Sequence, residues 1–157
     1  MINRTTARVV GALFITATVS IILSVVILEP VVKALDFLTQ ASINEARVAA
    51  GVLLEMVNNI AVVGIAVVIY PVLKPFSERL ALGYIAARII ESALFIIGTG
   101  HLLTLLLVSH EFVAAGAPPD SYFHTLGRIL LAGHDLDNAA LAFTIFSLGT
   151  LLLNYVL

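Results

Sequence analysis

Two residues of opposite charge lie inside a long apolar stretch and are the first candidates for chemistry. Arg88 and Glu91 fall within residues 80–108, which as a helix are long enough to cross a hydrocarbon core of roughly 30 Å. Positions three apart share a helix face, so the two side chains can form an ion pair. Because a charge that faces lipid is costly, this face is expected to look into a helix bundle.

Polar residues from other apolar segments are expected to meet this face. His101 follows Glu91 by ten residues, about 80° further round the helix, so both can border one cavity. One face of the second apolar segment is polar in its first half, and the last segment is polar near its start. The predicted buried polar cluster consists of Glu55, Asn58, Asn59, Arg88, Glu91, His101, His134, Asp137 and Asn138.

Two non-catalytic interpretations of this cluster stay open. In the first, the charges pair, Arg88 with Glu91 or Glu55, and the amides hold helices together at about 0.6–2 kcal/mol per hydrogen bond. The protein is then a helical bundle or a subunit of a membrane complex. In the second, the cluster binds or transports a small solute, an ion or a proton, because its carboxylates outnumber its one arginine.

A third interpretation is a metal-dependent membrane enzyme. His134 and Asp137 have a spacing that suits metal ligands on a helix, and His101 would complete a three-ligand site. The chain has no cysteine and none of the motifs GxSxG, GxxxxGK[ST] and HExxH. We therefore favour a protein without catalytic function and predict no cofactor, with a metal ion or a tetrapyrrole on His101 as the alternative.

Composition places the chain in the membrane. It is 61% hydrophobic and 11% charged, with a mean hydropathy of +1.10, whereas soluble domains are about 25% charged. So few polar residues could not cover the surface of a soluble domain. The net charge of −2 and the lack of a basic run argue against nucleic acid as a partner. Without tryptophan, interfacial anchors are expected from Tyr70, Tyr84, Tyr122 and Tyr155.

The pattern predicts one all-α domain over residues 1–157, a polytopic bundle of four transmembrane helices. The helices are expected at about 8–28, 46–73, 80–109 and 128–157, with a short interfacial helix between the first two. A continuous helix from residue 122 onward would be about 54 Å long, so a break is expected near Gly127 or Gly133.

The first helix carries a row of small hydroxyl residues. Thr16, Ser20 and Ser24 have the spacing that lets another helix approach closely, although such hydroxyls also bond back to their own backbone. The first and last helices are apolar almost all round. We therefore expect the partners to be the lipid bilayer and a second copy, or other membrane subunits.

Loop charges predict the orientation in the membrane. Short segments at one side hold Arg4, Arg8, Lys74 and Arg79, and much longer segments at the other hold Lys33, Arg47 and Arg128. Since cytoplasmic loops carry an excess of lysine and arginine, both termini are expected in the cytoplasm.

Several stretches together resemble a known family. They are the start from Arg4 to Gly11, Tyr70-Pro71-Val72-Leu73, Leu80-Ala81-Leu82-Gly83-Tyr84 with Arg88 and Glu91, and Glu111 to Pro118. This combination resembles an uncharacterised family of bacterial membrane proteins, domain of unknown function family 4386. The resemblance spans nearly the whole chain and implies an all-helical protein of the cytoplasmic membrane with no established activity. Family members usually continue through further helices, so the resemblance also implies a chain shortened at its C-terminus.

Overall fold

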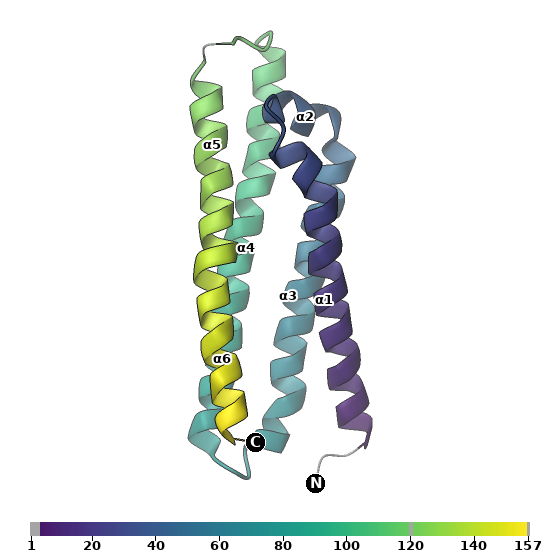
Figure 1. The fold of residues 1–157 in the computed structure, drawn as a ribbon, viewed down its shortest axis with the longest axis vertical. Coiled ribbons are helices and arrows are strands. Elements are labelled where there is room, and N and C mark those ends of the chain that lie inside the picture. Colours follow the sequence, from purple (N-terminus) through teal and green to yellow (C-terminus); the bar gives the residue numbers. More distant parts are fainter. Residues whose placement is uncertain (1–3, 120, 157) are drawn as a thin grey trace.

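Four long helical segments lie side by side in an elongated bundle (Figure 1). The computed structural model describes residues 4–119 and 121–156, apart from the side chains of residues 139, 155 and 156. The segments are α1 (Arg4–Val32), α3 (Glu45–Leu73), α4 (Glu78–Ala114) and a fourth span built from α5 (Tyr122–Asp135), the π-helix η1 (Leu136–Ala142) and α6 (Phe143–Val156). All four are long and apolar enough to cross a membrane, which confirms the predicted all-α multi-pass bundle. The predicted end of the last helix at Leu157 and the side chain of Tyr155 lie outside this description.

The first and third spans are longer than predicted, and the fourth begins at Tyr122 instead of near residue 128. α1 continues through Pro30 to Val32 instead of ending near residue 28. A proline removes one backbone hydrogen bond and crowds the preceding turn, and only two helical residues follow Pro30 before α1 ends. α4 runs from residue 78 to 114 instead of 80–109. Its start is fixed by Ser77, whose hydroxyl accepts a hydrogen bond from the Leu80 N–H at 3.4 Å.

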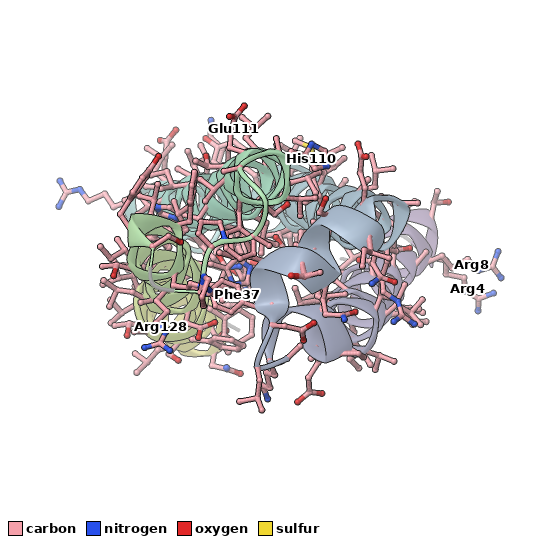
Figure 2. All side chains as sticks on the ribbon, turned by 90° about the horizontal axis from the view of Figure 1, so that it is seen from above. Arg4, Arg8, Phe37, His110, Glu111 and Arg128 are labelled. Carbon is pink, nitrogen blue, oxygen red and sulfur yellow. The ribbon has the colours of Figure 1, made fainter. Side chains whose placement is uncertain are left out.

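The predicted short helix is α2 (Phe37–Ile43), which covers one end of the bundle. Phe37, Leu38 and Ala41 are buried, and the first two pack against Leu105 and Phe112 of α4. Viewed from that end, α2 lies across the bundle with Phe37 pointing toward α5 (Figure 2). The helix is therefore attached to the protein by one apolar face.

The expected break at Gly127 or Gly133 is wrong, because α5 passes through both glycines. A Cβ at Gly127 would lie 2.7 Å from the Phe37 ring, and one at Gly133 would lie 3.0 Å from the His101 ring. The two glycines thus allow close approach of neighbouring side chains. The irregularity in this span is the π-helix further along, at Leu136–Ala142.

The helices pack in a row that does not close into a ring. α1 packs along α3, α3 along α4, and α4 along α5, η1 and α6, whereas α1 has no extended contact with the fourth span among the described residues (Figure 1). Ser24 Oγ donates to the Gly51 carbonyl of α3 at 3.0 Å, and Ser20 is buried beside it. The small-residue row is therefore used within the bundle, and the expectation that it receives a second copy is wrong for these two serines.

The start of α1, the end of α6 and the turn between α3 and α4 lie at one end of the bundle (Figure 1). α2 and the loop between α4 and α5 lie at the other. This arrangement is what an even number of spans requires.

Candidate functional site

One polar site lies between α3, α4 and the fourth span and is centred on Glu55. We call Glu55, Thr99, His134 and Asn138 the Glu55 site. Glu55 is 3% exposed. Thr99 Oγ1 donates to Glu55 Oε2 at 2.5 Å, and His134 Nε2 lies 3.1 Å from Glu55 Oε1. Within the described part of the chain, no lysine or arginine pairs with this carboxylate.

The hydrogen bonds at His134 depend on where one proton lies. Nε2 is 3.1 Å from the Glu55 carboxylate and 3.0 Å from Asn138 Nδ2, yet a ring nitrogen carries either one hydrogen or one lone pair. A protonated Nε2 donates to Glu55, and the Asn138 amide then turns its oxygen toward the ring. An unprotonated Nε2 instead accepts from the Asn138 amide, and the hydrogen of the neutral ring is then on Nδ1. The site therefore has two arrangements that differ in proton position.

Asn138 reaches this site because α4 has a glycine opposite it. A Cβ at Gly98 would lie 2.8 Å from Asn138 Cγ and closer still to Oδ1, so no larger residue fits there without displacing the amide. Oδ1 itself is buried without a hydrogen-bond partner. The amide is therefore held by packing on one side and by His134 on the other.

A cavity of about 310 Å³ extends from the Glu55 site to the end of α1. Its titratable lining residues are Glu29 and Lys33 at the end of α1, Glu55 on α3, and His134 and Asp135 on α5. The ammonium of Lys33 binds Glu29, and this hydrogen bond and the charge of the carboxylate raise the pKa of Lys33. Three carboxylates against one lysine give the cavity a negative potential.

The second polar site is the Arg88 site, formed by Tyr84, Arg88, Glu91 and Phe146. Arg88 and Glu91 are 3% and 2% exposed, and Arg88 Nη1 lies 2.7 Å from Glu91 Oε2. Arg88 Nε donates to Tyr84 Oη at 3.2 Å, and the guanidinium carbon lies 4.8 Å from the centre of the Phe146 ring. Eight residues of α4 separate Glu91 from Thr99, so the two sites are about 12 Å apart along the helix.

A cavity of about 230 Å³ borders the Arg88 site. Arg88, Glu91 and Asn58 form its polar floor, and its walls are mostly apolar side chains of α1, α3, α4 and the fourth span. It lies in the seam where α1 and α6 do not pack on each other. The predicted cluster is thus divided between two sites, each beside its own cavity.

The remaining predicted residues belong to neither site. His101 Nδ1 lies 3.4 Å from Asp137 Oδ2 but makes no well-aligned hydrogen bond, and both amide atoms of Asn59 are buried without a partner. His134 points to Glu55 and away from this pair. Accordingly, the described residues contain no group of three His, Cys, Asp or Glu side chains arranged to hold a metal.

Three residues of the two sites were not among those predicted. Thr99 lies eleven residues after Arg88, which places it on the same face three turns further along. Tyr84 precedes Arg88 by four residues, so helical spacing could have identified it too. Its expected role as an interfacial anchor is wrong, because it is fully buried. Phe146 comes from another helix, and no local spacing indicates its contact with Arg88.

The fold and its buried polar sites define an all-α integral membrane protein with several spans. The chain belongs to the family described as domain of unknown function DUF4386, whose model matches residues 9–157. Neither the curated proteins nor the solved structures contain a significant match.

Proposed function

We propose that the protein is a non-enzymatic membrane protein that binds a small cation at the Glu55 carboxylate, in competition with a proton. The observation that carries this proposal is a buried carboxylate that no lysine or arginine of the described residues pairs with, placed on the wall of a cavity rich in carboxylates. Thr99 offers only a hydroxyl dipole to the charge, and His134 compensates it only when its ring is protonated. A buried carboxylate of this kind is costly unless a cation or a proton compensates it.

The carboxylates that line the cavity beside Glu55 favour a cation as the ligand. Glu29 and Asp135 lie on its wall, and Lys33 is already paired with Glu29. Clefts lined by one sign of charge concentrate ions of the opposite sign. A small ammonium ion or a metal cation of low charge is therefore the expected ligand. Protonation of Glu55 or His134 would oppose its binding.

The test is thermal unfolding of purified protein titrated with methylammonium or sodium at about pH 8 and about pH 5, on either side of the ordinary imidazole range. At about 100 times the dissociation constant, a cation that binds only the folded state stabilises it by about 2.7 kcal/mol. We expect stabilisation at the higher pH, less at the lower pH, and none for Glu55→Gln.

The matched control is Glu111→Gln, because Glu111 lies on the outside of α4 at the α2 end (Figure 2). It removes the same charge from the chain and should keep the cation response. Equal stabilisation of wild type and Glu55→Gln would overturn the proposal. So would no response to either cation at either pH.

We also propose that the protein resides in a bacterial cytoplasmic membrane with both termini in the cytoplasm. The end of the bundle that holds the start of α1 also holds Lys74 in a short turn and Arg79 in the first turn of α4. Positively charged short loops favour the cytoplasmic side.

We propose further that the protein assembles with a second copy or another membrane subunit. Support comes from the outer faces of the first and last spans, where Ile15, Ile22 and Leu151 are exposed. Native mass spectrometry in mild detergent should show a dimer or a larger assembly. A folded monomer as the sole species would contradict this.

A further inference from the structure

We propose that the cavity at the Arg88 site is a second binding site, for a membrane-dissolved quinone or quinol ring. The site is separate from Glu55 and does not depend on the function proposed there. The inference rests on three observations: a cavity with a lateral opening, a polar floor with unused hydrogen-bonding groups, and aromatic walls.

The cavity lies where a molecule could enter from the hydrocarbon region. Its walls include Thr18 and Ile21 of α1 and Phe146 of α6, and these two helices have no extended contact among the described residues. Phe14 and Thr18 of α1 and Phe143 at the start of α6 are exposed on the outside of the seam. An apolar ligand would therefore reach the floor without crossing a headgroup layer.

The floor offers hydrogen bonds that the protein itself does not use. A guanidinium has five N–H donors, and the bonds of Arg88 to Tyr84 and Glu91 occupy two of them. Glu91 accepts through Oε2, which leaves Oε1 without a bond within the described residues. Asn58 is 5% exposed, lines the cavity and makes no side-chain hydrogen bond in the described part of the chain.

These groups suit a ligand that carries both carbonyl and hydroxyl oxygens. A ring carbonyl would accept from the free N–H groups of Arg88 and Asn58. In the reduced ligand, a ring hydroxyl would donate to Glu91. Because Arg88 and Glu91 neutralise each other, the floor does not favour a ligand with a net charge, such as an anionic lipid headgroup.

The walls suit a flat ring better than a flexible chain. Four phenylalanines line the cavity, namely Phe14, Phe95, Phe143 and Phe146, and aromatic side chains stack favourably on planar rings. An apolar cavity of about 150 Å³ is large enough for benzene. The cavity here, at about 230 Å³, has room for a substituted or fused ring, whose tail would leave through the seam.

The test is calorimetric titration of menadione into protein-containing nanodiscs, with empty nanodiscs as the blank. We expect saturable binding by the protein. Thr18→Phe, which fills the mouth of the cavity, should weaken binding about tenfold or more, whereas Thr16→Phe should change it less than about twofold. Thr16 is exposed on the same helix but does not line the cavity, so this control adds the same ring elsewhere.

Asn58→Leu removes an amide from the floor and should also weaken binding, with folding checked by thermal unfolding. Absence of saturable menadione binding, or equal binding by wild type and both variants, would overturn the proposal. So would displacement of menadione by equimolar decanol or phosphatidylglycerol, because the cavity would then take any alkyl chain or a lipid. The cation response of Glu55 is measured without menadione, so the two proposals can fail separately.

Discussion

Arg88 is held by three different interactions at the centre of the bundle. Glu91 supplies the opposite charge, Tyr84 accepts from Nε, and the ring of Phe146 covers the guanidinium. Removing one partner of a buried pair leaves an uncompensated charge, which typically costs about 3–5 kcal/mol. The loss of one partner would therefore remove a large part of a stability that is usually about 5–15 kcal/mol.

A double-mutant cycle should reveal this coupling. We expect Arg88→Met to lower the free energy of unfolding markedly, because Glu91 is then stranded in the bundle. Adding Glu91→Gln should restore at least half of the loss. Denaturation in detergent measures all four variants. Additive losses would mean that Arg88 and Glu91 do not stabilise each other.

Two glycines only two residues apart in α4 should respond differently to alanine. Gly98→Ala places a methyl group against Asn138, so we expect destabilisation and a displaced His134. Gly100→Ala meets no atom within 4 Å and should be neutral or slightly stabilising, since alanine is the better helix former. Thermal unfolding of both variants is the measurement, and similar Tm values would contradict the packing described for Asn138.

The pairings within the two sites were predictable only where one helix holds both partners. Arg88 and Glu91 are three apart, and that spacing predicts their pair. Glu55 is different, because its partners come from α4 and α5, and helical spacing does not fix the rotation of one helix against another. Thr99 also stands between two glycines in an apolar run, so its hydroxyl gave no signal of a charged partner.

At the scale of elements, the π-helix is the feature with the clearest consequence. A π-helical turn accommodates an extra residue inside an otherwise α-helical segment. Here it lies between His134 on α5 and Gly149 on α6, which is buried against Ala87 and Arg88. The extra residue therefore sets how α5 and α6 are rotated relative to each other.

Deletion variants test this role. Deleting Ala140 should convert η1 into a regular α-helix and keep the face of α6 that packs on α4. Leu148 lies in a regular α-helix that contains no extra residue. Its deletion should therefore rotate the end of α6 by about 100°. We expect the second deletion to lower the Tm much more than the first, as measured by circular dichroism. The reverse order would show that the π-helix is needed for folding.

Composition predicted the elements better than their irregularities. Long apolar runs predict four spans, and α2 follows from the apolar spacing of its connector. The glycines of α5 misled the prediction, since Gly127 and Gly133 provide space for Phe37 and His101 and do not interrupt the helix. A π-helix has no sequence pattern of its own, so its position at Leu136–Ala142 could not be predicted.

At the scale of the whole molecule, the absence of cysteine makes the orientation easy to test. Ser77→Cys places a thiol in the turn between α3 and α4, and Pro118→Cys places one in the loop at the opposite end. With intact cells, an impermeant maleimide should label position 118 and leave position 77 unlabelled until the membrane is opened. Labelling of position 77 from outside would reverse the proposed orientation.

The length of the apolar segments and the charges of the loops predicted only part of the overall arrangement. These features predict how many spans there are and which ends lie together. They do not predict that α1 stays apart from the fourth span, because that depends on the combined rotation of four helices. The cavity at the Arg88 site, which exists because of this separation, was therefore not predictable.

Because the helices form an open row, the protein has two halves, α1 with α3 and α4 with the fourth span, which are joined along α3 and α4. In the described chain, the side-chain hydrogen bonds that cross from α1 and α3 to the other half all end on Glu55, while His110 and Glu45 are 3.6 Å apart at the exposed end. A proton or cation on Glu55 would weaken these bonds without disturbing the packing of either half. Apolar contacts of α2 and α3 with α4 hold the halves together whatever the charge on Glu55. The charge on this one side chain would therefore change how firmly the halves are joined at the Glu55 site, and not whether they stay together.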